Sequence, residues 1–226
     1  CWGPVKRYFP FHSHKDVPRE AVLKVLTYNV MAFGYKNHTK IAPNKIIQYI
    51  ANSDADIVCL QEYATAKSEK SLTASKIYDA LSMYPYRSVF YQSSTKFQSF
   101  GIAVFSKYPL SNSRMVKYDS DYNGSSVHEV NIKGKKLILI NHHLESFKLT
   151  MEDRTRYSSL IKSFSSDGLD DLKGAFEQKL GPAFRIRAKQ AEAVSKEIKN
   201  AKGDYVLVCG DFNDSSISYA HLTIQG

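Results

Sequence analysis

The sequence lacks three features that would assign it to common protein classes. It has only three cysteines in 226 residues, and Cys59 and Cys209 lie within apolar runs, so we expect buried free thiols and no disulfide framework. No apolar run approaches the roughly 18 residues that span a bilayer. Neither a P-loop nor a GxGxxG pattern occurs, which excludes these two glycine-rich phosphate-binding motifs.

The sequence contains fewer acidic than basic residues. The chain has 31 Lys+Arg against 22 Asp+Glu and a formal net charge of +9. A basic surface favours an anionic partner such as a phosphodiester, a phosphorylated small molecule or an acidic membrane, although such a charge also serves solubility alone. The 15 Tyr and 12 Phe are typical of a packed chain, and the length predicts one domain, with two small ones as the alternative.

Predicted strands and helices alternate along the chain without internal repeats. Residues 1–20 contain three prolines and mixed charge, so we expect an extended lead-in there and one domain over residues 21–226. Pro43 opens a predicted helix that reaches Ile50, and a second helix is expected over Ser71–Met83. Later strands, with a hairpin turn at Gly134, are predicted over Tyr86–Tyr91, Gly101–Phe105, Arg114–Tyr118, Ser126–Ile132 and Lys136–His143.

A mainly helical insertion is predicted over about residues 145–186. Thr150 and Asp153 have the spacing of a capping box, residues 165–168 predict a break, and a second helical piece is expected to end at Gly181-Pro182. A further helix is predicted over Arg185–Asn200. Because the insertion directly follows a predicted strand end, it is either a lid over the site or a packing appendage.

Polar residues follow four apolar strands. Tyr205–Cys209 leads into Gly210-Asp211-Phe212-Asn213, and Asp56–Leu60 leads into Gln61-Glu62. Val22–Thr27 leads into Tyr28-Asn29, and Lys136–Ile140 leads into Asn141-His142-His143. Ligands of α/β proteins collect beyond the C-terminal ends of strands, so this pattern predicts a single site.

The residue types at these strand ends suit phosphoester chemistry. Glu62 offers hard oxygen ligands and Asn29 a neutral one, which together suit Mg²⁺ or Mn²⁺ with water and phosphate in the remaining positions. Asp211 can orient or deprotonate an attacking water, and Asn213 can donate to a phosphate oxygen. His143 can donate a proton or a hydrogen bond to the substrate.

Zinc is the rival interpretation of His142-His143. Adjacent residues on a strand point to opposite faces, so the two imidazoles do not bind one ion. No cysteine or further histidine lies at metal-ligand spacing around them. The sequence therefore predicts no zinc site.

Six segments in this order resemble the endonuclease/exonuclease/phosphatase superfamily from about Val22 onward. They are Thr27-Tyr28-Asn29-Val30, Asp56-Ile57-Val58-Cys59-Leu60-Gln61-Glu62, Gly101-Ile102-Ala103-Val104-Phe105-Ser106-Lys107-Tyr108-Pro109, Asn141-His142-His143-Leu144, Arg187-Ala188-Lys189-Gln190 and Gly210-Asp211-Phe212-Asn213. The resemblance implies a four-layer α/β sandwich of two packed mixed sheets flanked by helices. It also implies Mg²⁺-dependent phosphoester hydrolysis by water attack, with Asn29 and Glu62 at the metal, Asp211 and Asn213 catalytic and phosphate-binding, and His143 the first of two catalytic histidines.

Two departures from the family pattern qualify the resemblance. Asn141-His142-His143-Leu144 replaces the Tyr-containing motif of abasic-site endonucleases, so the chain is more similar to the branch of deoxyribonuclease I, sphingomyelinases and inositol-phosphate phosphatases. The Ser-Asp-His motif that supplies the second catalytic histidine does not occur. We therefore expect a domain lacking its last strands, with impaired turnover and association through an unpaired sheet edge.

The beginning of the chain predicts a longer parent protein. It opens on Cys1 rather than Met, and the stretch from Val5 to Pro18 resembles bacterial members that carry hydrophobic spans before this domain, which implies a membrane tether in the parent. Three functions stay open: a metal-dependent phosphoesterase with a nucleic acid, phospholipid headgroup or inositol phosphate as substrate, an impaired phosphate-binding module, or a membrane-surface binding module.

Overall fold

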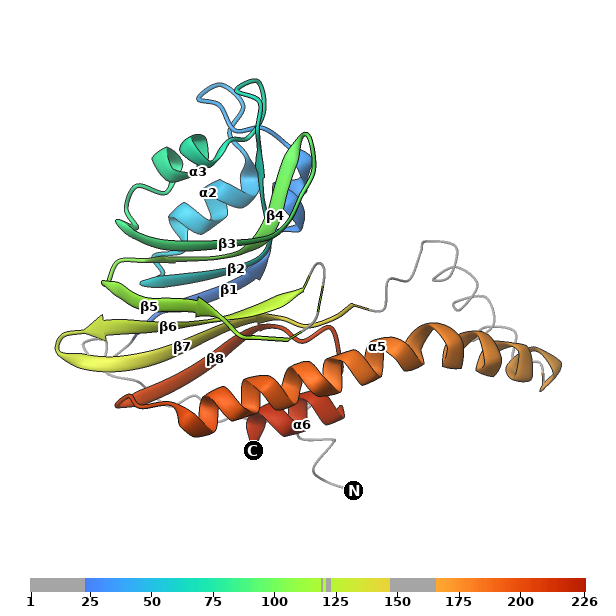
Figure 1. Cartoon of the computed structure of the whole chain (residues 1–226). Helices are drawn as coiled ribbons and strands as arrows, with labels where there is room; N and C mark the ends of the chain where they lie inside the picture. Colours follow the sequence, from blue (N-terminus) through green and yellow to red (C-terminus); the bar gives the residue numbers. More distant parts are fainter. Residues whose placement is uncertain (1–22, 119, 121–122, 147–165) are drawn as a thin grey trace, which may run out of the picture.

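The structure is a computed structural model that describes residues 23–118, 120, 123–146 and 166–226, with backbone only for residues 166–180. Two four-stranded sheets pack face to face, with α2 and α3 outside one sheet and α5 and α6 outside the other (Figure 1). The predicted four-layer α/β sandwich is confirmed. The predicted lead-in over residues 1–20 and the predicted capping box at Thr150 lie outside the described residues.

The first sheet contains one parallel and two antiparallel pairings. Its strand order is β1-β2-β4-β3, and β1 pairs with β2 in parallel. The strand bounds are β1 (Val25–Asn29), β2 (Ile57–Ala66), β3 (Tyr86–Ser94) and β4 (Gln98–Ser106). Because the first part of β2 is buried on both faces, Ile57–Leu60 is a continuous apolar run rather than an alternating one.

Two capped helices cover the outer face of this sheet. Helix α2 (Lys45–Asn52) begins after Asn44, whose side chain accepts hydrogen bonds from the backbone N–H groups of Ile46 and Ile47. Asn44, and not the predicted Pro43, therefore sets the helix start, because it satisfies donors that lack a partner within the helix. Helix α3 (Ala74–Ala80) is shorter than predicted, since Thr73 caps its start.

The second sheet has the order β5-β6-β7-β8, with β7 and β8 parallel. Its strands are β5 (Leu110–Met115), β6 (Gly124–Ile132), β7 (Lys135–His143) and β8 (Tyr205–Asp211). The turn between β6 and β7 contains Gly134 with φ +83°, as the hairpin prediction requires. Within the described residues β5 and β8 are the two edge strands of this sheet. Association through an unpaired edge stays a prediction.

Helices α5 (Ser166–Asn200) and α6 (Tyr219–Gln225) pack below the second sheet (Figure 1). The predicted stop at Gly181-Pro182 is wrong, because α5 continues through both residues. Pro182 lacks the N–H that would bond the carbonyl four residues earlier, so α5 continues with one backbone hydrogen bond fewer at this point. None of the described helices is long and apolar enough to cross a membrane.

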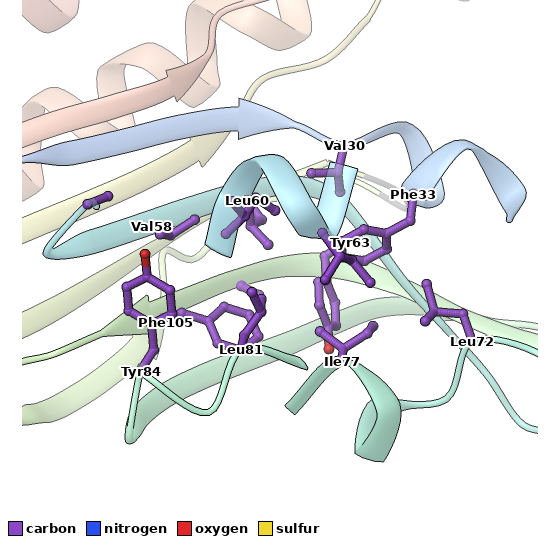
Figure 2. Packing of buried hydrophobic residues seen from close by; sticks show 14 residues of the cluster. Val30, Phe33, Val58, Leu60, Tyr63, Leu72, Ile77, Leu81, Tyr84 and Phe105 are labelled. Atoms are coloured by element: carbon purple, nitrogen blue, oxygen red, sulfur yellow. The ribbon is translucent and has the colours of Figure 1, made fainter. Parts of the chain in front are cut away.

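Three apolar clusters hold the layers together. The cluster between the first sheet and its helices joins Val58 and Leu60 to residues of α2 and α3 such as Ile77 (Figure 2). The residues that alternate with them on the same strand, Ile57 and Cys59, face the second sheet instead. A third cluster packs the second sheet against α5 and α6. Because successive side chains of β2 point to opposite faces of the sheet, the strand contributes to two apolar clusters.

Candidate active site

Three of the predicted site residues, which lie on strands of both sheets, form one hydrogen-bond network. The Asn29 side-chain amide donates to Glu62 Oε1 at 2.8 Å and to Asp211 Oδ2 at 2.9 Å. Asn29 ends β1, Glu62 lies in β2 and Asp211 ends β8, so the network spans the sandwich. Residues 182 positions apart in the sequence are brought to one point.

Glu62 lies in a β-bulge, and not at a strand end as predicted. β2 continues to Ala66, but its pairing with β4 shifts by one residue between Leu60 and Tyr63. Glu62 has φ +49°, a left-handed conformation that is unfavourable for a residue with a Cβ atom. A bulge bends the strand and redirects a side chain, which explains how a residue inside a strand reaches the site.

The Asp211 carboxylate is held at both oxygens. Oδ2 accepts from Asn29, and Oδ1 accepts from the backbone N–H of Asn213 at 2.9 Å. The Asn213 side-chain amide donates to the carbonyl of Leu144 at 2.9 Å. Asn213 therefore ties the end of β8 to the end of β7, and its proposed contact with phosphate would use its second amide hydrogen.

His143 faces the carboxylates from β7. It is the register partner of Asp211 on the adjacent parallel strand, and its Nε2 lies 3.9 Å from Glu62 Oε1. Burial lowers the pKa of His143, while the carboxylates of Asp211 and Glu62 act in the opposite direction. Nε2 is buried without a hydrogen-bond partner among the described residues, as expected of an atom that awaits a ligand.

His142 points to the opposite face, as the strand period predicts. Its ring lies edge-on to Phe212 with a centroid distance of 4.2 Å, in the layer that contains α5 and α6. Burial lowers its pKa to about 3, so it is neutral at physiological pH. No cluster of three or more His, Cys, Asp or Glu arranged to hold a metal ion occurs within the described ranges.

Arg187 fixes the loops that follow β7 and β8. Its side chain is 1% exposed, its Nε donates to Asp214 at 3.0 Å and its Nη1 donates to the carbonyl of Glu145 at 2.7 Å. One turn along α5, Gln190 accepts from the backbone N–H of Glu145. Both residues appear in the sequence only as part of a family motif, and their roles depend on contacts that no local pattern reveals.

A second amide pair joins the two sheets beneath the site. Gln61 on β2 donates to Asn141 Oδ1 on β7 at 2.8 Å, and both side chains are at most 1% exposed. Asn141 in turn donates to the carbonyls of Leu60 and Ala103. A satisfied buried network of this kind fixes the register of one sheet on the other.

A cavity of about 480 Å³ opens beside the network. Glu62 and His143 line it together with Tyr35, Phe100 and Asn123. Tyr35 ends a short 3₁₀ segment, η2 (Met31–Tyr35), that begins two residues after Asn29. We call this cavity the Tyr35 pocket.

A divalent cation fits the donors at this site. Two carboxylates converge on one neutral amide, and no Lys or Arg of the described residues forms an ion pair with Glu62 or Asp211. Mg²⁺ commonly takes one or two carboxylates and keeps several waters, which agrees with this sparse set. Asn29 presents its nitrogen to Glu62, while its oxygen accepts from the backbone of Met31. Its role as an oxygen ligand therefore stays a prediction.

Comparisons with known proteins agree with this architecture. Residues 26–225 match the model of the Endonuclease/Exonuclease/phosphatase family, whereas no curated protein matches by sequence. Similar solved structures include sphingomyelinase C from Streptomyces griseocarneus, at 21% identity, covering 89% of this chain and 68% of that chain, with a TM-score of 0.55. A Staphylococcus aureus β toxin with bound magnesium ions is 21% identical, with 89% and 68% covered and a TM-score of 0.52.

The third structure, D. rerio TDP2 with a single-strand DNA product, is 18% identical, with 90% of this chain and 65% of that chain covered and a TM-score of 0.53. Likeness at these identities establishes the fold, and the family match over most of the chain establishes descent. The chain therefore belongs to the endonuclease/exonuclease/phosphatase family, whose common reaction is the hydrolysis of phosphoester bonds.

Proposed function

We propose that this protein hydrolyses an anionic phosphoester by water attack with the help of Mg²⁺ or Mn²⁺. The observation that carries the proposal is the convergence of Glu62, Asp211 and His143 from three strands around the Asn29 amide. Paired carboxylates with a neighbouring imidazole suit phosphoryl transfer, in which positioning and charge neutralisation supply most of the catalysis.

Each residue has a distinct role in this proposal. Glu62, with Asn29, holds the ion, which when bound neutralises phosphate charge and stabilises the leaving oxygen. Asp211 accepts a hydrogen bond from the attacking water and orients it toward phosphorus. Burial lowers the pKa of His143, so the neutral imidazole is available at Nε2 to hydrogen-bond the phosphate. Asn213 keeps Asp211 in place and offers its remaining amide hydrogen to a phosphate oxygen.

Three observations support the choice of cofactor and substrate. The similar β toxin contains magnesium ions, and the other two similar structures are a sphingomyelinase and a protein with a DNA product. The net charge of +9 favours anionic substrates. A membrane tether in a parent protein stays a prediction, since no described residue bears on it.

A catalytically impaired phosphate-binding or membrane-surface module is the second candidate. It is favoured by the histidine content of the site, where His143 is the only histidine that the described residues supply. His142 and His221 both pack on Phe212, His128 bonds two serines, and His38 accepts from the backbone of Asn44. Loss of one acid–base group typically lowers the rate by about 10²–10⁴-fold. Feeble turnover is therefore the expected result for these 226 residues.

Hydrolysis of bis(p-nitrophenyl) phosphate separates the two candidates. We expect slow release of p-nitrophenol that requires Mg²⁺ and is abolished by EDTA, by Glu62→Gln and by Asp211→Asn. Glu69→Gln is the matched control, because Glu69 is exposed and outside the site. Phosphate binding without any turnover supports the impaired module, and vesicle binding that survives Glu62→Ala supports the membrane-surface module.

A further inference from the structure

The Tyr35 pocket shares a wall with the proposed reaction centre. Glu62 and His143 belong both to its lining and to the site. A phosphate bound between these residues would project one of its ester groups into the cavity. The chemistry of the remaining lining therefore bears on which ester groups the protein accepts.

The described lining is apolar or neutral except at the reaction centre itself. Tyr35, Phe100 and Ala32 supply apolar surface, while Ser93, Thr95 and Asn123 supply uncharged polar groups. No Lys or Arg occurs among these described lining residues, although the chain contains 31 of them. Additional phosphate groups on a substrate are normally recognised by Arg or Lys. Glu62 would repel them.

Tyr35 is held at the pocket by an unusual backbone. Met31, Ala32, Phe33, Gly34 and Tyr35 all have positive φ values, between 44° and 64°. Side chains disfavour this conformation, and runs of it are rare. Ala32 and Phe33 are buried and anchor the segment, whereas Tyr35 is 67% exposed. An exposed aromatic ring fixed on such a backbone is positioned to contact a ligand.

We propose that the Tyr35 pocket binds the alcohol portion of a phosphodiester, and that this portion is uncharged and has an apolar or aromatic face. The inference rests on the proposed function and narrows its substrate class. In the reaction a water oxygen bonds to phosphorus, one phosphorus–oxygen ester bond breaks, and the departing alcohol takes a proton derived from the water. A polyphosphorylated ring such as an inositol phosphate is disfavoured.

The experiment compares three substrates with the full chain in Mg²⁺. These are bis(p-nitrophenyl) phosphate, the p-nitrophenyl ester of thymidine 5′-phosphate, and inositol 1,4,5-trisphosphate. We expect kcat/KM for both diesters to exceed that for the trisphosphate. The better diester identifies the source of the group, either a nucleoside or a simple aryl-type alcohol. A preference for the trisphosphate overturns the inference.

Variants of Tyr35 test the pocket itself. Tyr35→Ala is expected to raise KM for bis(p-nitrophenyl) phosphate about tenfold, the effect of losing one aromatic contact, with kcat changed less than twofold. Tyr35→Phe retains the ring and is expected to leave KM unchanged. Tyr205→Ala is the matched control, because Tyr205 is 61% exposed and does not line this pocket. An unchanged KM in Tyr35→Ala overturns the inference.

A binding measurement separates failure of the inference from failure of the proposed function. Calorimetry with diphenyl phosphate in Mg²⁺ requires no turnover, and Tyr35→Ala is expected to weaken binding about tenfold. If no substrate is hydrolysed but this loss is observed, the catalytic proposal fails and the pocket assignment stands. Equal binding by the unsubstituted chain and by Tyr35→Ala, or no binding by the unsubstituted chain, overturns the pocket assignment whether or not turnover occurs.

Discussion

Arg187→Met should destabilise the protein strongly, because it removes one partner of a buried ion pair. The side chains of Arg187 and Asp214 are 1% and 9% exposed, so the substitution leaves the Asp214 carboxylate buried without its cation. Breaking such a pair costs about 3–5 kcal/mol. At this chain length, a loss of about 3 kcal/mol corresponds to a fall in Tm of about 6–12 °C. Urea titration and thermal melting measure both quantities.

Two controls make this prediction specific. Arg185→Met removes an exposed arginine from the same helix, and we expect a change below about 0.5 kcal/mol. Arg187→Met combined with Asp214→Leu should recover part of the loss, since the uncompensated charge is removed. If Arg187→Met costs less than about 1 kcal/mol, or if the double variant is no better than the single one, the buried ion pair does not hold these loops.

Three further predictions concern stability. Burial lowers the pKa of His128 from 6.5 to about 4, so on acidification the unfolded chain takes up a proton at this residue before the folded chain does. The free energy of unfolding that neutral His128 contributes is therefore complete above pH 6.5 and should be about 2 kcal/mol lower at pH 5. In urea titrations between these pH values, His128→Gln should make the free energy of unfolding depend less on pH. Gly210→Ala should lower the free energy of unfolding by about 3 kcal/mol or more, because its Cβ would lie 1.9 Å from the carbonyl oxygen of His142. Gly134→Ala is the control: a Cβ there meets open space, and the loss should be only about 1–2 kcal/mol. Equal losses in the two variants would contradict the close approach at Gly210. Ala32→Gly should raise Tm by a few degrees by relieving its left-handed φ of 52°, and a lower Tm would show that the buried methyl group matters more.

The strand and helix periods of the sequence predict most of the individual elements, whereas the arrangement in four layers is implied only by the family resemblance. Apolar runs before Asn29, His143 and Asp211 identify three strands and the edge at which their ends meet. β5 is predicted too late in the chain, since its early residues Ser111 and Asn112 are exposed and polar and interrupt the period. Helix α5 is predicted in pieces because Pro182 is a strong local stop signal, whereas the helix of the structure continues through it.

The site is predictable in its residue types but not in its hydrogen bonds. The sequence indicates Asn29 as an oxygen ligand, whereas the structure shows its nitrogen bridging Glu62 and Asp211. The bulge that redirects Glu62 leaves no periodic signal in the sequence, because it consists of one extra residue in a buried strand. Contacts such as that between Arg187 and Asp214 join segments 27 residues apart and depend on the packed structure.

Calorimetric titration of Mn²⁺ tests the central claim most directly, since it measures the metal site without requiring turnover. The account predicts one ion per chain, more than tenfold weaker binding in Glu62→Gln, and unchanged binding in the exposed-site control Glu69→Gln. Far-ultraviolet circular dichroism should show that both variants are folded. Equal Mn²⁺ affinity in the unsubstituted chain and in Glu62→Gln, or no binding by the folded unsubstituted chain, would contradict the assignment of this site to a divalent cation.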